Sequence, residues 1–201
     1  RLDDGELAVI KKDEINVYNF SGERLEKTPF YVDWDISAAE KCGYDHFMLK
    51  EIMEQPKAIR DTINPRIKDG KIILDKFSLT KEEIEKISKI CIVACGSAYH
   101  VGCVAKYVFE KMLRKPVEVE VASEFRYRAP IIDDTVLVIA ISQSGETADT
   151  LAALKEAKKN KARTLSIVNV IGSSIANASD DVLYTWAGPE IAVATTKAYS
   201  T

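Results

Sequence analysis

Five short apolar runs that alternate with helical patterns constrain the fold of this chain more than any other feature. The runs lie at residues 90–94, 117–121, 135–141, 164–168 and 181–185. Helical patterns precede the first run and separate most of the others, at residues 81–88, 99–113, 124–127 and 148–160. Near-continuous apolar strands that alternate with helices are typical of a parallel sheet covered by helices on both faces. The sequence therefore predicts an α/β domain over residues 71–201.

The first 37 residues are predicted to form antiparallel β structure. Strand-like runs at residues 7–10, 15–18 and 30–32 are separated by polar turns at residues 11–14 and 19–23. So few strand residues cannot bury a core of their own. We therefore interpret residues 1–37 as the end of a larger β-containing domain.

Residues 38–70 change to a helical pattern that we interpret as a linker between domains. Six apolar residues recur there at helical spacing: Phe47, Met48, Ile52, Met53, Ile59 and Ile63. Pro56 is expected to end one helix and begin a second at its first turn, because proline lacks the N–H that a helix interior needs. The polar, glycine-containing residues 66–70 are expected to be an irregular connection to the α/β domain.

Composition excludes several classes of function. Of 201 residues, 28 are Lys or Arg and 31 are Asp or Glu, and the net charge of −3 comes without any basic run, so no nucleic-acid partner is expected. The longest apolar stretch, residues 135–141, is too short to cross a membrane, and the N-terminus carries no signal-peptide pattern. A cytoplasmic protein is expected. The residues that could bind a transition metal are scattered in the sequence, with no Cys-x-x-Cys pair: Cys42, Cys91, Cys95, Cys103, His46 and His100. Neither a metal nor another cofactor is therefore predicted. The cysteine thiols are expected to be reduced.

The strongest candidate site is the turn at residues 142–147 (SQSGET), which directly follows the apolar run at 135–141. Parallel strands end at one edge of the sheet, where ligands bind. Ser142, Ser144 and Thr147 place three hydroxyls at a strand-to-helix turn, and Gly145 allows close backbone approach. This combination suits a phosphate group, although Ser144 or Thr147 could instead only cap the helix.

Two further turns follow strands. In the turn Cys95-Gly96-Ser97-Ala98, helix capping by Ser97 is the simpler interpretation, but two such turns on neighbouring strands could face one pocket. The segment at residues 187–197 carries Glu190, two threonines and Lys197, and this lysine is expected to lie in the first turn of a helix and to be solvated.

These motifs together resemble a known family. The sequences CGS at 95–97, ASEFRYR at 122–128, SQSGETADT at 142–150 and EIAVATTKAY at 190–199 resemble the first sugar isomerase (SIS) domain of the glutamine–fructose-6-phosphate aminotransferases, also called glucosamine-6-phosphate synthases. Residues 50–56 resemble the interdomain helix of that family, and residues 2–32 resemble the tail of its glutaminase domain. The resemblance implies a three-layer αβα SIS-type domain with a mostly parallel sheet, preceded by a short β-rich remnant and a helical linker.

The resemblance also assigns roles to residues of this chain. It implies that Ser142, Gln143, Ser144 and Thr147 hold the phosphate of fructose 6-phosphate, and that the same pocket is lined by Cys95, Ser97, Val193, Ala194 and Thr195. Ala98 stands where the family usually has a hydroxyl residue, so only its backbone N–H is expected to contribute.

The family makes glucosamine 6-phosphate and glutamate from fructose 6-phosphate and glutamine, and its members are dimers or larger assemblies. Its cysteine nucleophile, glutamate base, ring-opening histidine and Schiff-base lysine belong to segments outside residues 1–201, so no catalytic residue is expected in this chain. Glutamine would be handled by the absent glutaminase domain, and this chain alone is expected to bind the sugar phosphate without turning it over.

Two other functions stay open at this point. One is a non-catalytic SIS module that senses a sugar phosphate; the hairpins and helix of residues 1–70 argue against it. The other is a SIS-type aldose–ketose isomerase, which the motifs disfavour because they contain no clear base.

Overall fold

The computed structural model describes residues 2–28, 40–74 and 77–201. It divides into two compact units, Arg1–Asp35 and Ile36–Thr201, which are described separately. The second unit contains both the parallel sheet and the helix that precedes it.

The N-terminal unit is a small antiparallel sheet of β1 (Glu6–Ile10), β2 (Ile15–Asn19) and β3 (Arg24–Leu25). The side chain of Asn19 organises the second turn, because its Oδ1 accepts hydrogen bonds from the backbone N–H groups of Ser21 and Glu23, both at 3.0 Å. The first two predicted strands are confirmed, and the third, at residues 30–32, lies outside the described residues. Ile10, Ile15 and Phe20 are exposed in this unit.

The second unit is built on a five-stranded sheet in which all strands are parallel. Its members are β6 (Lys89–Ala94), β7 (Val117–Val121), β8 (Val136–Ser142), β9 (Arg163–Val168) and β10 (Asp181–Tyr184), in the order β10-β9-β8-β6-β7. All five predicted strands are confirmed. Their apolar runs were recognisable because both faces of these strands are buried.

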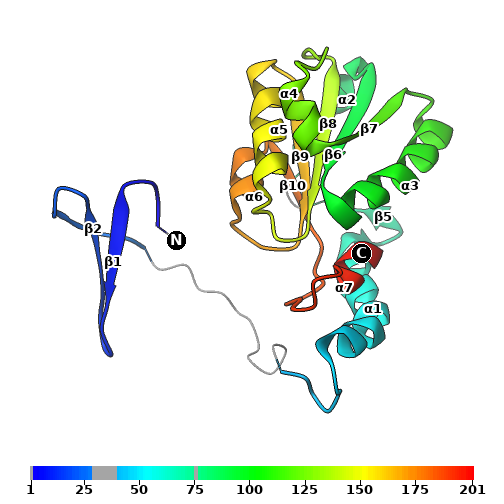
Figure 1. The fold of residues 1–201 in the computed structure, drawn as a ribbon. Coiled ribbons are helices and arrows are strands. Elements are labelled where there is room, and N and C mark those ends of the chain that lie inside the picture. The colour runs from blue at the N-terminus through cyan, green and yellow to red at the C-terminus, as the bar shows by residue number, and fades with distance from the viewer. Residues whose placement is uncertain (1, 29–39, 75–76) are drawn as a thin grey trace. The chain divides into compact units, whose positions relative to one another are not determined.

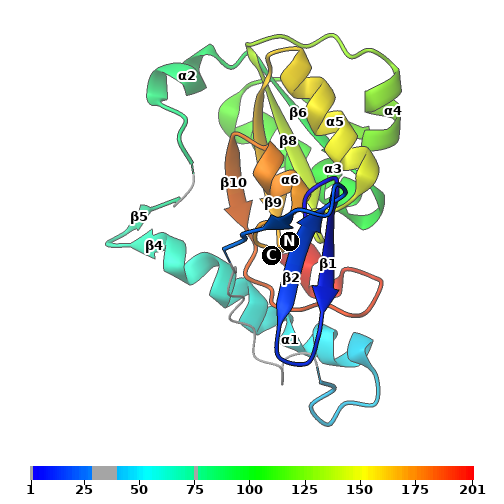
Figure 2. The same ribbon diagram turned by 90° about the vertical axis from the view of Figure 1, so that its left-hand side faces the viewer.

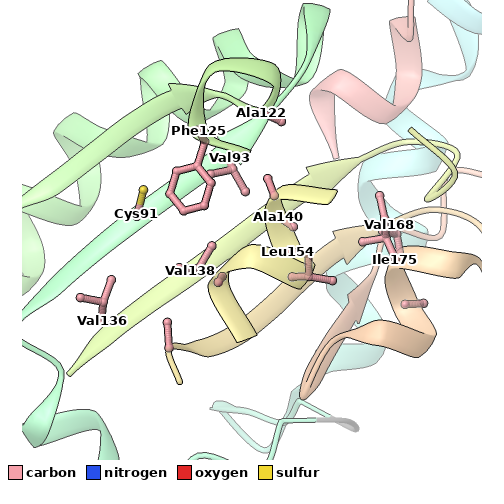
Figure 3. Close-up of a cluster of buried hydrophobic side chains, with 14 residues drawn as sticks. Cys91, Val93, Ala122, Phe125, Val136, Val138, Ala140, Leu154, Val168 and Ile175 are labelled. Atoms are coloured by element: carbon pink, nitrogen blue, oxygen red, sulfur yellow. The ribbon is translucent and has the colours of Figure 1, made fainter. Parts of the chain in front are cut away.

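Helices cover both faces of this sheet and complete the three predicted layers (Figure 1). On one face lie α4 (Ala122–Tyr127), α5 (Ala148–Lys159) and α6 (Ser174–Ala178), which share a hydrophobic core with the sheet. Phe125 of α4 and Leu154 of α5 are fully buried in that core (Figure 3).

The other face of the sheet is covered by α3 (Gly96–Leu113), through Ala105 and Phe109. Residues flanking the short helix α2 (Lys81–Lys86) join this second core, among them Leu79 and Ile87. In α2, Thr80 and Glu83 form a capping box, in which the Thr80 side chain accepts from the Glu83 backbone N–H. Both helices differ from their predicted bounds at one end: α2 ends two residues earlier, and α3 begins three residues earlier.

The prediction that Pro56 begins a second helix is wrong. A single helix, α1 (Phe47–Ile63), runs through this position. The N–H that proline lacks would have bonded to the carbonyl of Ile52, and the side-chain amide of Gln55 donates to that oxygen instead, at 3.0 Å. The neighbouring side chain thus compensates locally for the missing backbone hydrogen bond.

The connection after α1 is more regular than expected. A 3₁₀ turn, η2 (Asn64–Arg66), leads into a hairpin of β4 (Ile67–Lys68) and β5 (Lys71–Ile72). Asp69 and Gly70 form its two-residue turn with φ of 51° and 72°, the left-handed values that such a tight hairpin requires. An Asp-Gly pair is a known signal for this turn.

Two short helices complete the unit: α6, which was not predicted, and α7 (Thr196–Ser200), which confirms that Lys197 lies in the first turn of a helix. Helix α7 packs against α1 beneath the carboxyl edge of the sheet (Figures 1 and 2). Among the described residues, no helix combines the length and apolar character that crossing a lipid bilayer requires.

Candidate functional site

The candidate site lies where the chain reverses its direction of progress across the sheet. From β6 the chain moves outward to β7 and then returns to β8 on the other side of β6. Ala94 pairs with Ile141 at the carboxyl ends of β6 and β8, so the turns at residues 95–98 and 142–147 leave adjacent strands. A reversal of this kind is where open α/β sheets bind their ligands.

A cavity of about 120 Å³ opens at this edge. It brings together residues from all three predicted segments: Ala98 from the first turn, Ser142 and Gln143 from the second, and Thr195 from the C-terminal segment. The remaining lining residues are Val101, Ile141, Ile167, Thr185, Ala198, Tyr199 and Thr201. Three stretches that are far apart in sequence therefore share one pocket.

The other predicted site residues lie near this cavity in sequence but do not line it: Cys95, Ser97, Ser144, Thr147, Val193 and Ala194. Val193 is 99% exposed. The sulfur of Cys95 accepts a hydrogen bond from Thr150 Oγ1 of α5 at 3.7 Å, so it links the first turn to the helix that follows the second.

Neither serine-containing turn uses a side chain to cap its helix. Cys95 is the N-cap residue of α3, with Ser97 already inside the helix, so capping by Ser97 is wrong. Thr147 is the N-cap residue of α5, but its side chain makes no capping hydrogen bond. The first-turn N–H groups of α3 and α5 thus receive no capping bond from the side chains of their N-cap residues, and both helices direct their positive ends toward this edge.

The hydroxyls of the 142–147 turn hold the turn itself in shape. Ser142 Oγ lies 3.0 Å from Thr147 Oγ1 and accepts a hydrogen bond from the Gly145 N–H at 3.0 Å. Ser144 Oγ accepts from the Glu146 N–H at 3.2 Å. These bonds fix a compact turn before any ligand binds.

Gly145 fastens this turn to α6. Its φ is +66°, and a Cβ at this position would lie 2.0 Å from Ser173 Oγ. The Gly145 carbonyl accepts from the Ile175 N–H at 2.9 Å, and Glu146 Oε1 accepts from the Ser174 N–H at 2.8 Å. Only glycine fits both the backbone angle and the close approach.

The C-terminal segment carries a buried charge cluster where a solvated lysine was predicted. Lys197 is only 4% exposed, and its Nζ lies 2.7 Å from Glu54 Oε2 of α1, so that prediction is wrong. Glu190 Oε1 accepts from the backbone N–H groups of Lys197 and Ala198, at 2.9 and 3.3 Å. Burial raises the pKa of the Glu190 carboxyl, against the lowering effect of these two N–H groups, and the charge of Glu51 adds to the rise.

Sequence reasoning missed Asn169, which joins two walls of the site. Its backbone N–H donates to the Gln143 carbonyl at 3.0 Å. Its side chain accepts from the Ala187 N–H at 3.0 Å and donates to the Gly188 carbonyl at 2.8 Å. A polar residue directly after β9 was the available signal, since it occupies the same strand-end position as the predicted turns.

One group of potential metal ligands exists among the described residues, away from this cavity: Cys91, Glu118 and Glu120. Arg128 Nε donates to Glu120 at 2.5 Å, and Lys89 Nζ lies 3.1 Å from Glu118. Burial, together with the charges of both glutamates, raises the pKa of the Cys91 thiol to about 12. A protonated thiol beside two ion-paired carboxylates is a poor metal site.

Comparison with known proteins identifies the domain. The family model described as "SIS domain" matches residues 83–201. A solved structure described as the C-terminal domain of glucosamine-fructose-6-phosphate aminotransferase from Francisella tularensis is 49% identical, with a TM-score of 0.75, and the match covers 80% of this chain and 45% of that one. A glucosamine-6-phosphate deaminase from Thermotoga maritima is 26% identical with a TM-score of 0.62, over 77% of this chain and 44% of the other.

Full-length relatives extend the similarity to the N-terminal unit. The glutamine–fructose-6-phosphate aminotransferase (isomerizing) of Caldanaerobacter subterraneus subsp. tengcongensis is 61% identical over 100% of this chain, which covers 33% of that protein. The protein of the same name from Clostridium acetobutylicum gives the same identity and coverage. The chain thus spans about one third of the length of these relatives, and its parallel-sheet unit belongs to the SIS domain family.

Proposed function

We propose that this chain binds the phosphate end of a sugar phosphate at the carboxyl edge of its parallel sheet. The observation that carries this proposal is the cavity in which Ala98, Ser142, Gln143 and Thr195 meet. The turn at 142–147 and the uncapped first turns of α3 and α5 supply N–H and O–H donors beside it.

Donors and helix ends, rather than cationic side chains, would hold the phosphate. No lysine or arginine is among the residues that line the cavity in the described structure. Two cationic side chains of the motifs have partners elsewhere: Lys197 with Glu54, and Arg126 with Asp149 at 2.8 Å. A phosphate dianion is well matched to several backbone N–H groups at helix N-termini, without any lysine.

The relatives point to the identity of the sugar and to the reaction of the whole protein. We propose that the ligand is fructose 6-phosphate, and that the chain is the sugar-phosphate-binding part of a glutamine–fructose-6-phosphate aminotransferase. In this proposal the described site holds and orients the sugar phosphate, and ammonia release and isomerisation need residues from other segments of the protein. We also propose that the protein acts in the cytoplasm, where free thiols such as those of this chain stay reduced, and as a homodimer or larger assembly.

A non-catalytic sugar-phosphate sensor is the second candidate. It shares the fold and the cavity, so it predicts the same binding. The aminotransferase is favoured because the 61% identity extends through the antiparallel N-terminal unit and α1, outside the SIS domain itself.

Fructose 6-phosphate should stabilise the chain far more than fructose does. A ligand at ~100 times its dissociation constant raises the free energy of unfolding by about 2.7 kcal/mol, and most of the affinity here is expected from the phosphate. The measurement is the shift in melting temperature with fructose 6-phosphate, fructose and inorganic phosphate at equal concentrations. Equal shifts with fructose and its 6-phosphate would contradict a phosphate-binding site.

Ser144→Ala and Thr147→Ala should each weaken fructose 6-phosphate binding by roughly 1–3 kcal/mol, the range for hydrogen bonds to charged groups. Neither side chain caps α5, but each makes one hydrogen bond within the 142–147 turn, so each substitution should also lower the free energy of unfolding without ligand by about 0.5–1.5 kcal/mol. Calorimetric titration gives the affinity and urea unfolding gives the stability. A loss of stability with unchanged affinity would show that these hydroxyls serve only the fold.

A further inference from the structure

Helix α1 buries charged side chains and exposes apolar ones, the reverse of what is usual for an amphipathic helix. Lys50 and Glu51 are 3% and 2% exposed, whereas Ile52 and Met53 are 42% and 59% exposed. Burying a carboxylate is unfavourable unless hydrogen bonds or opposite charges compensate. The buried face of α1 must therefore be matched by specific partners. Lys50 Nζ donates to the Glu40 carbonyl and lies 3.7 Å from Glu54 Oε1, whereas the partners of Glu51 lie in the C-terminal segment.

Glu51 is bound to the backbone of the C-terminal segment. Its Oε1 accepts hydrogen bonds from the N–H groups of Ile191 and Ala192, at 2.6 and 3.0 Å. Its Oε2 is buried and has no hydrogen-bond partner in the described structure. The hydrogen bonds that the described structure gives this carboxylate thus come from two adjacent amides, and both depend on the path of residues 190–193.

The next turn of α1 holds the same segment through side chains. Glu54 Oε2 pairs with the buried Lys197 at 2.7 Å, and Gln55 accepts a hydrogen bond from Ser200 Oγ. One turn earlier, the sulfur of Met48 accepts from Thr196 Oγ1 at 3.1 Å. We call Glu51, Glu54 and their contacts to residues 191–197 the α1 clamp.

Thr195 lies inside the span that the clamp holds, and its backbone is strained. Its φ and ψ are 55° and 39°, a left-handed conformation that β-branched residues rarely adopt. Such a conformation persists only when the surrounding contacts enforce it. Clamp contacts lie on both sides of it in the sequence, at residues 191–192 and at Lys197. Thr195 lines the same cavity as Ser142 and Gln143.

We propose that Glu51 and Glu54 are positioning residues for the sugar-phosphate site, which act by fixing the strained wall that contains Thr195. Neither carboxylate lines the cavity, so their influence on binding passes through the backbone at residues 191–197. The inference rests on the proposed function, because it needs a ligand in that cavity. It makes α1 a functional part of the site and not only a connection between domains.

The test compares two substitutions of Glu51, one that changes the length of the side chain and one that changes its charge. Glu51→Asp keeps the charge but is one methylene too short to reach both amides. Glu51→Gln keeps the length and an oxygen acceptor but loses the charge. Asp61→Ala is the matched control, because Asp61 lies on the same helix and, among the described residues, its ion pair is with Lys57 of that helix and not with the C-terminal segment. All are made in the full chain and titrated with fructose 6-phosphate.

Glu51→Asp should weaken fructose 6-phosphate binding roughly 10-fold or more, the equivalent of one lost charge-assisted hydrogen bond. Glu51→Gln should retain most of the affinity of the unaltered chain, and Asp61→Ala should leave the affinity unchanged. Trypsin supplies a readout without ligand: cleavage after the buried Lys197 should accelerate in Glu51→Asp and not in Asp61→Ala.

Faster cleavage with unchanged affinity would overturn the inference, because the clamp would hold the segment without shaping the site. Unchanged cleavage and affinity in Glu51→Asp would overturn it as well. If the unaltered chain bound no sugar phosphate, the proposed function would fail and this inference with it, while the trypsin result would still report whether the clamp exists. If Glu51→Asp does not fold, Glu54→Gln, which weakens the pair with Lys197, is read by the same two measurements.

Discussion

Gly145→Ala should lower the free energy of unfolding by about 2–5 kcal/mol and remove sugar-phosphate binding. The left-handed backbone at this position disfavours any residue with a Cβ by about 1–2 kcal/mol. The added methyl group would also lie 2.0 Å from Ser173 Oγ and 2.5 Å from Ser173 Cβ, and such overpacking adds about 1–3 kcal/mol. The turn must move away from α6 to relieve the contact, which displaces Ser142 and Gln143. Urea unfolding and calorimetric titration measure the two effects.

Two variants separate the contact from the backbone angle. Gly172→Ala has a similar φ of +71° with nothing within 4 Å of the added Cβ, so only the smaller backbone effect is expected. Adding Ser173→Gly to Gly145→Ala removes both clashing atoms, and Ser173 Oγ has no hydrogen-bond partner to lose in the described structure. The double variant should recover stability to the level of Gly172→Ala. If Gly145→Ala were no worse than Gly172→Ala, the close approach would not limit the turn.

Phe125→Ala should destabilise the parallel-sheet unit by about 3–5 kcal/mol, the usual range for removing a buried aromatic side chain. Phe125 is fully buried between α4, α5 and the sheet, beside Val93 and Ala122 (Figure 3). The resulting cavity lies in the main core and cannot be filled by solvent-exposed groups. Urea unfolding monitored by circular dichroism measures the loss.

Tyr107→Ala is the matched control, because it removes an aromatic side chain of helix α3 that is 73% exposed. Its effect should stay within about 0.5 kcal/mol. Similar losses for both variants would mean that the α4 core contributes less than its burial indicates.

Residues 122–128, the motif that contains Phe125, contribute to the packing of the fold. Residues 122–128 helped to identify the family, yet the structure gives them packing roles. Phe125 fills the core, Arg126 pairs with Asp149 of α5, and Arg128 pairs with Glu120 of β7. A motif can be specific to a family because it joins helices and strands, without touching a ligand.

The parallel sheet could be predicted because its signal is local. Each strand is a short run of apolar residues, and the residues that follow a strand must lie at the ligand-binding edge once the strands are parallel. The adjacency of Ala98 and Ser142 follows from this rule. It does not need knowledge of any side-chain contact.

The far wall of the cavity could not be predicted in the same way. Thr195, Ala198 and Tyr199 line it because α7 packs on α1, and that contact depends on Glu51, Glu54 and Lys197 finding one another. Helical spacing indicated an apolar face that includes Ile52 and Met53, but in the structure both are exposed and the charged residues Lys50 and Glu51 are buried. The ion pair with Glu54 also explains why Lys197 is buried, although its neighbours in sequence predicted a solvated side chain.

The Pro56 prediction failed for a local reason that was visible in the sequence. Proline removes one hydrogen bond from a helix, but the preceding Gln55 can replace it by donating to the Ile52 carbonyl. A glutamine directly before a proline therefore weakens the case for a helix break.

The α1 clamp also has a consequence for how the chain reaches its folded state. The hydrogen bond from the Ile191 N–H to Glu51 joins residues that are 140 positions apart, whereas neighbouring strands such as β6 and β7 are joined through the single helix α3. Closing a longer loop costs more chain entropy, and contacts of high sequence separation slow folding. During synthesis from the ribosome, the sheet and the 142–147 turn could assemble before residues 191–197 emerge. The strained wall at Thr195 would then close last, so the binding cavity becomes complete only when both ends of this unit meet.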